Sequence, residues 1–186
     1  VLGQDSHAGS SPMNTRRDSL VIAASLITQI NQLGMSYGEG GRSTVGVLSL
    51  KPASRNTVPG CTEFSVDLRH PNNEILLEMH YSLEKIINQT NSSSNLKVEL
   101  KQIFYSEGVT FNEKCVEIVQ HSSDLLGYKS KKMFSGAGHD AVYISKVAPT
   151  SMIFVPCKDG LSHNELESAK SSDLEAGCNV LLQSIL

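Results

Sequence analysis

The chain has 186 residues, of which 39% are hydrophobic and 19% charged, and its formal net charge is −3. This length allows one domain or two small ones, and the composition is that of an ordinary globular protein. The slight negative charge gives no electrostatic basis for binding nucleic acid or an anionic membrane surface. No apolar stretch approaches the roughly 18 residues that a membrane-spanning helix requires.

The first part of the chain predicts a strand, a helix and a pair of strands. Residues 1–3 resemble the end of a strand, and a loop is expected over residues 4–17. Asp18 can cap a helix that runs to about Leu33. The apolar spacing predicts that its inner face consists of Leu20, Ala23, Ala24, Ile27, Ile30 and Leu33.

Residues 44–50 and 62–69 are predicted to form paired strands around a long connection. In the second strand, Phe64, Val66 and Leu68 alternate with polar residues. Because successive side chains point to opposite faces of a sheet, one face should pack and the other should be open.

Pro71 ends this strand, and Asn72 or Asn73 can cap a second helix. A loop over residues 88–95 and a final strand over residues 96–104 are then expected. Strand, helix, strand, strand, helix, strand is the order of the ferredoxin-like fold. We therefore predict an α+β domain of this type over residues 1–104, with both helices on one face of its sheet.

The rest of the chain has a different pattern. Its predicted elements are a helix from Asn112 to Leu126, a helix from the GAGHDA stretch to about Lys146, a buried strand at 152–155, and a last helix that begins with a Ser172–Glu175 capping box. One strand is too few for a stable sheet. Residues 105–186 are thus expected to be the C-terminal part of a larger α/β domain whose N-terminal part lies upstream.

Cysteine usage gives an expectation about the compartment. The four cysteines are scattered and form no CxxC motif: Cys61, Cys115, Cys157 and Cys178. This pattern favours reduced thiols in a cytoplasmic protein over a disulfide framework or a zinc knuckle.

Three histidines lie in loops with glycine neighbours, namely His7, His139 and His163. Neutral imidazole is a common metal ligand, and His163 follows an apolar run whose end could direct it into a cleft. Taken singly, each histidine fits an exposed loop residue better than a ligand. Together they indicate a site, because their glycine neighbours leave space for a bound molecule.

Arg69 lies on the open face of its predicted strand. A guanidinium group matches a carboxylate in a bidentate arrangement, which suits an anionic substrate. An ion pair with Asp67 or Glu63 on the same face is an equally good interpretation, and the sequence leaves both open.

Five motifs occur in a fixed order along the chain: GQDSHAGSSPMNTRRD, PASRNTVPG, FSVDLRH, SGAGHDA and MIFVPCKDGLSHNELE. Together they resemble the dizinc amidohydrolases that include N-carbamoyl-L-amino-acid hydrolase, β-alanine synthase (β-ureidopropionase) and allantoate amidohydrolase, within a wider group of aminoacylases and exopeptidases. The resemblance implies that residues 1–104 are a ferredoxin-like lid or dimerisation domain. Residues 105–186 would be the C-terminal part of a zinc-aminopeptidase-like α/β domain.

The resemblance also implies roles for individual residues. His7 would reach across a homodimer and stabilise the oxyanion of the tetrahedral intermediate. Asn56 and Arg69 would bind the carboxylate of the substrate. His139 would contact the substrate or the transition state, and Gly160 would offer a backbone N–H.

His163 would be a ligand to one of two divalent metal ions, with zinc expected and manganese, cobalt or nickel as alternatives. The other ligands and the general base precede the lid in this family, and none has a counterpart here. We therefore expect this chain to be an incomplete fragment that is inactive alone.

For the complete protein, the implied activity is hydrolysis of the linear C–N bond of an N-carbamoyl (ureido) amino acid or a related small carboxylate. It would be a cytoplasmic homodimer that pairs through the lid. The alternatives are a relative of the aminoacylase or exopeptidase type, or a non-catalytic dimerisation module.

Overall fold

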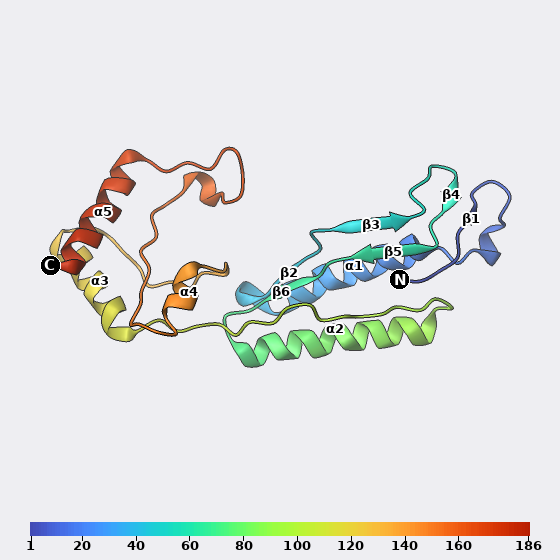
Figure 1. Ribbon diagram of the computed structural model, residues 1–186, viewed down its shortest axis with the longest axis horizontal. Coiled ribbons are helices and arrows are strands. Elements are labelled where there is room, and N and C mark those ends of the chain that lie inside the picture. Colours follow the sequence, from blue (N-terminus) through green and yellow to red (C-terminus); the bar gives the residue numbers. More distant parts are fainter. The chain divides into compact units, whose positions relative to one another are not determined.

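The computed structural model describes residues 1–186, and the chain divides into two compact units, Val1–Gly108 (unit 1) and Val109–Leu186 (unit 2) (Figure 1). Unit 1 contains β1 (Ser6–His7), α1 (Ser19–Ser36), β2 (Arg42–Thr44), β3 (Leu48–Lys51), β4 (Thr57–Val58), β5 (Cys61–Phe64), β6 (Asp67–Arg69) and α2 (Asn73–Ser93). Unit 2 contains α3 (Glu113–Leu125), α4 (Asp140–Ile144) and α5 (Ser171–Ile185). The mixed α/β class predicted from the sequence is confirmed at this level.

The two long helices of unit 1 begin where their caps predict. The Asp18 side chain accepts hydrogen bonds from the backbone N–H groups of the first turn of α1, and Asn72 does the same for α2. The loop predicted over residues 88–95 is wrong, because α2 continues to Ser93. Hydroxyl groups in this polar stretch bond back to carbonyls four residues earlier (Thr90 to Ile86, 2.9 Å), which accommodates them within the helix.

The predicted strand pair is confirmed, with an interruption. β3 pairs antiparallel with β5, from Leu48 opposite Phe64 to Lys51 opposite Cys61. β2 pairs with β6, and its last residue, Thr44, lies opposite Asp67. Residues 45–47 therefore lie opposite residues 65–66 only. The first segment has one residue more than the second, as in a β-bulge.

The N-terminal residues lie between two other segments. Leu2 forms antiparallel bridges with both Cys61 of β5 and Lys97, so the neighbours run β3, β5, Leu2, Lys97. The strand predicted over residues 96–104 is wrong beyond this bridge, since residues 98–112 have no regular structure.

The core of unit 1 lies between the two helices and the strands. It comprises Leu26, Ile30, Leu33, Leu83, Ile87 and Val98. The predicted inner face of α1 is correct at Ala23, Ile30 and Leu33, but Ala24 is exposed and Leu26 is buried instead. The partly buried Phe64, Val66 and Leu68 pack against this core, whereas Glu63, Asp67 and Arg69 are exposed, as the alternation predicts.

Unit 2 consists of helices and irregular segments. α3 starts at its predicted cap, Asn112, but α4 ends at Ile144, before the predicted end at Lys146. α5 begins after Lys170 without a side-chain cap, so the predicted Ser172–Glu175 capping box is wrong. Residues 152–155 form no strand, because no other segment of unit 2 provides a backbone ladder for them.

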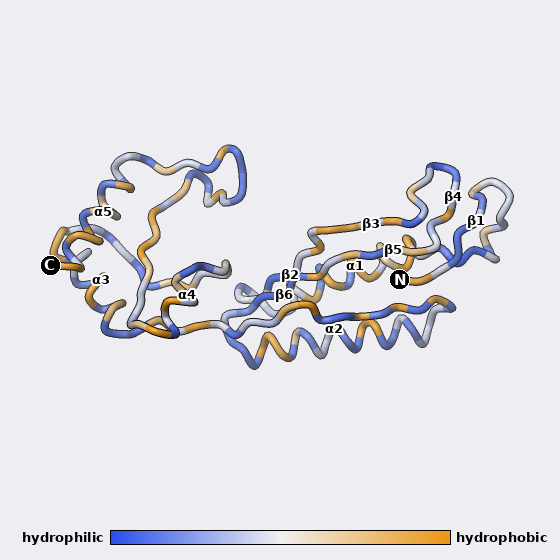
Figure 2. The backbone as a smooth tube through the Cα atoms, in the orientation of Figure 1, coloured by the Kyte–Doolittle hydropathy of each residue, from blue (hydrophilic) through white to orange (hydrophobic).

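The apolar faces of α3 and α5 are largely uncovered, and Figure 2 shows hydrophobic residues along both helices. Only Val180 is a buried hydrophobic residue in this unit. The exposed apolar positions of these helices are Ile118, Leu125, Leu126, Leu174, Cys178, Leu181, Leu182 and Ile185. Periodicity identified the apolar stripes correctly, but unit 2 contains no sheet to cover them. No helix of the chain is both long and apolar enough to span a membrane.

Candidate functional site

His7 and Asn56 lie together at one end of unit 1. β1 pairs antiparallel with β4, so that His7 lies opposite Thr57. The next residue of the first segment, Ala8, donates its N–H to the carbonyl of Asn56 at 2.8 Å. The structure thus brings together two residues that the sequence predicted separately for the site. The pairing itself was missed, because residues 4–17 were expected to be a simple loop.

The imidazole of His7 is fixed by its own loop. The N–H groups of Gly9 and Ser10 both point at Nδ1, at 3.0 and 3.3 Å. A backbone amide can only donate, so Nδ1 accepts, and in the neutral ring the proton is on Nε2. Glycine suits position 9, where a Cβ atom would be 3.3 Å from the ring. His7 therefore presents an N–H donor on the side away from the loop.

Arg16 binds two carbonyl groups of this loop, a role that the sequence did not predict. Its Nη2 donates to the carbonyl of Ala8 at 2.6 Å, and its Nε donates to that of Ser11 at 3.0 Å. Two bonds from one planar group fix both ends of the turn that follows His7. An arginine within a loop has no periodic pattern, so the sequence alone gave no signal for this role.

The Asn56 side chain is also oriented. Its Oδ1 accepts hydrogen bonds from the hydroxyl groups of Ser54 and Thr57, at 2.9 and 3.4 Å. The carbonyl end of the amide is thereby used within the chain, and the Nδ2 end, which carries two N–H donors, is directed elsewhere. Asn56 is exposed, so these donors suit an anionic group of a bound molecule.

Arg69 forms an ion pair with Asp67, the arrangement that the sequence left open beside carboxylate binding. Nε and Nη2 lie 2.9 and 2.7 Å from the two carboxylate oxygens. This hydrogen-bonded contact lowers the pKa of Asp67 and raises that of Arg69. Both side chains are about half exposed, at 49% and 48%, so the pair lies at the surface.

Arg69 does not lie with His7 and Asn56. Those two residues lie beside β4, next to the start of β5, whereas Arg69 is at the end of β6, the opposite end of unit 1 (Figure 1). The eight steps of extended chain from Cys61 to Arg69 span about 26 Å at about 3.3 Å per residue. One small substrate cannot contact both ends of the same unit.

In unit 2, His139 contacts Ser135 of the same motif. Its Nε2 is 2.7 Å from the Ser135 hydroxyl group, which also accepts the N–H of Ala137 at 3.2 Å. The ring meets Phe154 edge-on, with centroids 5.5 Å apart. A Cβ atom at Gly136 or Gly138 would meet no other atom within 4 Å, so the backbone at these two positions is not crowded.

The loop of His163 has an unusual backbone. Asp159 and His163 adopt positive φ angles of 54° and 56°, and Gly160 has a φ of 67°. Such conformations are uncommon for non-glycine residues and cluster at functional loops. The N–H of His163 donates to the Glu167 carboxylate at 3.0 Å. The Gly160 N–H donates to the Cys157 carbonyl at 3.1 Å, a bond that must break before this group could serve a substrate.

The donor set does not by itself fit a metal centre. No group of three or more His, Cys, Asp or Glu side chains is arranged to hold a metal ion. A single imidazole leaves most of the coordination sphere of a divalent ion unfilled. The residues of this chain alone thus do not fit a two-metal site.

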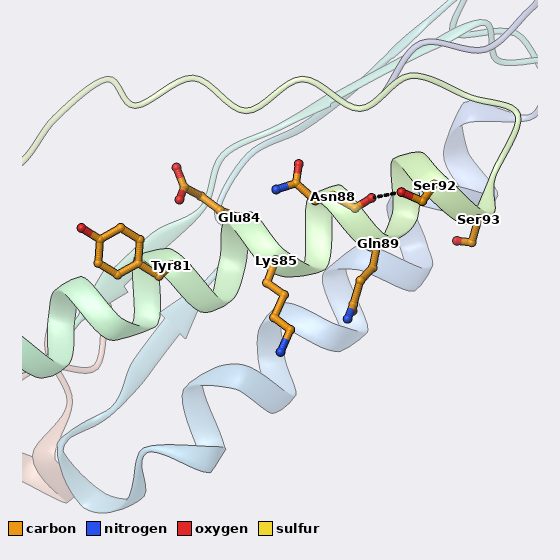
Figure 3. A pocket seen from close by; sticks show the side chains of 7 residues that line it. All are labelled: Tyr81, Glu84, Lys85, Asn88, Gln89, Ser92 and Ser93. Carbon is orange, nitrogen blue, oxygen red and sulfur yellow. Dashed lines mark hydrogen bonds between the residues drawn. The ribbon is translucent and has the colours of Figure 1, made fainter.

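A hollow along α2 is not a competing site. Its lining residues are Tyr81, Glu84, Lys85, Asn88, Gln89, Ser92 and Ser93 (Figure 3). All belong to one helix, so the hollow has a single wall, and it contains none of the predicted site residues.

Comparisons with known proteins bear on the whole chain. Residues 9–186 match the family described as peptidase family M20/M25/M40. The chain is 35% identical over 186 residues to the N-carbamoyl-L-amino-acid amidohydrolase of Rhizobium meliloti, a match that covers 100% of this chain and 45% of the relative. It is 28% identical over 179 residues to the allantoate amidohydrolase of Bacillus subtilis (strain 168), covering 96% of this chain and 43% of the relative.

Among solved structures, an amidase of the hydantoinase/carbamoylase family from Burkholderia vietnamiensis matches with a TM-score of 0.93 and 43% identity. This match covers 99% of this chain and 45% of that one. The chain therefore spans less than half the length of the relatives that it matches.

Proposed function

Because the chain belongs to peptidase family M20/M25/M40, as its motifs predicted, we propose that the complete protein hydrolyses a linear C–N bond of an N-carbamoyl amino acid or a related ureido compound. The observation that carries this proposal is the match of the whole chain to a relative named for that activity. The donors at His7, Asn56 and Arg69 suit the charges of such a substrate.

We further propose that unit 1 is a ferredoxin-like lid and unit 2 the C-terminal part of the catalytic domain. The order of neighbouring segments, β3, β5, Leu2 and Lys97, supports the first assignment. When the four predicted strands of residues 1–104 are numbered along the chain, this order is 2-3-1-4, that of a split βαβ fold of the ferredoxin-like type. The exposed apolar faces of α3 and α5 support the second, because the missing strands of an α/β domain would cover them.

Unit 1 is proposed to form the homodimer. β3 pairs only with β5, so its other edge is open for another strand. Val47, just before β3, and Leu48, its first residue, expose 64% and 49% of their surface, which apolar contacts in a dimer would cover. A dimer also resolves the separation of the site residues, since the two ends of one unit can serve two different active sites.

Each residue then has a defined chemical role. The Nε2–H of His7 donates to the oxygen on which negative charge develops, in the site of the other subunit. Asn56 Nδ2 of one subunit and the Arg69 guanidinium of the other anchor the substrate carboxylate, and Asp67 keeps Arg69 ordered when no substrate is bound. His139, fixed by Ser135, contacts the substrate.

Two divalent metal ions are proposed for the complete protein, most simply zinc. When bound, such ions polarise the scissile carbonyl and activate a water molecule. His163 would supply one ligand, and the others would come from outside this chain.

The test is a hydrolysis assay of the protein at the full length of its relatives. We expect metal-dependent release of ammonia from N-carbamoyl-L-amino acids or allantoate. Cleavage of acyl-amino acids or tripeptides alone would contradict the proposal and favour the exopeptidase alternative. No turnover by a metal-loaded protein would favour a non-catalytic module.

A further inference from the structure

Arg42 lies directly opposite Arg69 in the ladder between β2 and β6. Opposed residues of an antiparallel pair point to the same face, with Cβ atoms about 5 Å apart. Asp67, two residues before Arg69, shares that face, as does Thr44 opposite it. The side chains of Arg42 and Arg69 therefore leave the ladder next to each other and on the same face.

This surface is the open face of the strands. The alternate residues point the other way, since Ser43 donates to the Ile30 carbonyl of α1 at 2.7 Å and Leu68 packs against the core. Arg42 and Arg69 are both exposed. A second cation, Arg42, thus lies beside Arg69, the residue proposed to bind the substrate carboxylate.

The charges on this face are not balanced. Asp67 forms its ion pair with Arg69, whereas Arg42 forms none. Arg42 donates through Nη1 to the carbonyls of Glu39 and Gly41, and its Nε and Nη2 have no partner. Like charges placed directly opposite each other destabilise a strand pair. An anion between the two groups would remove that cost and use the remaining donors of Arg42.

We propose that Arg42 binds a second anionic group of the substrate, so that the enzyme prefers carbamoyl amino acids with an acidic side chain. This inference rests on the proposed function. Arg69 would hold the α-carboxylate, and Arg42, anchored by its backbone contacts, would hold the side-chain carboxylate. The fork of a guanidinium group is suited to both.

A purely structural role makes a different prediction. If Arg42 only fastens the turn over Gly38–Gly41 through the carbonyls of Glu39 and Gly41, its loss lowers stability without changing substrate preference. Arg42→Met keeps much of the side-chain length and removes the charge and the donors. Arg17→Met is a matched control, since Arg17 is also exposed and donates to one backbone carbonyl, that of Asn95.

The first experiment does not depend on hydrolysis. Glutarate and butyrate are titrated separately into this chain, and the arginine Nε–H signals are followed by NMR. We expect glutarate to shift the signals of both Arg42 and Arg69 and to bind roughly tenfold more tightly than butyrate. In Arg42→Met this advantage should vanish, whereas Arg17→Met should retain it. Equal binding of the two anions by the unsubstituted chain would overturn the proposal.

The second experiment uses the full-length protein with N-carbamoyl-L-glutamate and its uncharged analogue N-carbamoyl-L-glutamine. Arg42→Met should lower kcat/KM for the glutamate compound by roughly tenfold and leave the glutamine compound nearly unchanged. An equal loss for both compounds would refute the assignment while leaving the proposed hydrolase intact. If the unsubstituted protein hydrolyses neither, the proposed function fails, and the titration still decides the role of Arg42.

Discussion

The guanidinium group of Arg69 donates two hydrogen bonds to the carboxylate of Asp67, with N–O distances of 2.9 and 2.7 Å. The contact lowers the pKa of Asp67 from its usual 3.8. A carboxyl group with a depressed pKa stabilises the fold above its unfolded pKa, and this contribution is lost as the pH falls through the folded pKa.

The first prediction follows from the lowered pKa of Asp67. Asp67→Asn should reduce the free energy of unfolding at pH 7 by less than about 1 kcal/mol, because the pair is half exposed and screened by solvent. The difference between variant and parent should shrink as the pH falls below about 4 and disappear only below the lowered folded pKa of Asp67, where the parent carboxyl group is also neutral. Urea denaturation at pH 7 and at a series of lower pH values measures this dependence, and a difference that does not shrink as the pH falls would mean that packing, not charge, is responsible.

The second prediction concerns Arg69 as a carboxylate anchor. Arg69→Lys keeps the charge but loses the bidentate fork, so binding of substrates with a free α-carboxylate should weaken by roughly 1–3 kcal/mol. Kinetics of the full-length protein should show this as a higher KM. A substrate analogue whose α-carboxylate is capped as an amide should be hardly affected. Equal losses for both compounds would indicate a role in folding instead.

The third prediction tests the start of α1. Asp18 accepts the N–H groups of Leu20 and Val21, at 2.9 and 3.3 Å. Asp18→Ala should cost about 1 kcal/mol of stability, whereas Asp18→Asn, which can accept the same bonds, should cost little. Thermal unfolding of the two variants gives the comparison, and similar losses would show that charge at the helix start matters more than the cap.

The helix caps and the alternation of the strand residues were predicted well from the sequence. The caps at Asp18, Asn72 and Asn112 are local, since a side chain and the amides it accepts are within three residues. The alternation around Phe64 likewise identified the packed and open faces of its strand, because a strand's period of two is a property of the backbone.

Features that depend on distant partners were predicted poorly. The apolar run at 152–155 has the composition of a buried strand, but a strand requires a neighbour, and unit 2 provides none. The bond from the Ala8 N–H to the Asn56 carbonyl, and the bonds from Arg16 to the loop after His7, depend on loop geometry, which leaves no periodic pattern in a sequence. Motif resemblance named His7, Asn56 and Arg69, but it could not show that Arg69 lies at the other end of the unit.

The fourth prediction concerns His163 in the full-length protein. His163 has a positive φ, and its N–H donates to the Glu167 carboxylate. His163→Ala should reduce bound metal and hydrolysis together, because one ligand of a preformed site is lost. Elemental analysis after dialysis measures the first quantity independently of activity. Full metal content with full activity would mean that His163 is only a loop residue.

The last prediction tests whether His7 serves the other subunit. His7→Ala should lower kcat for every substrate and leave KM nearly unchanged, because its N–H is expected to matter mainly in the transition state. His7→Ala subunits are then mixed with His163→Ala subunits, and the dimers are allowed to exchange. If His7 acts across the interface, a mixed dimer places both defects in one site and leaves the other intact, so activity returns. If His7 serves its own subunit, every site keeps one defect and no activity is recovered. Mass spectrometry of the mixed dimer establishes that exchange has occurred, so absent recovery would refute the cross-subunit role of His7.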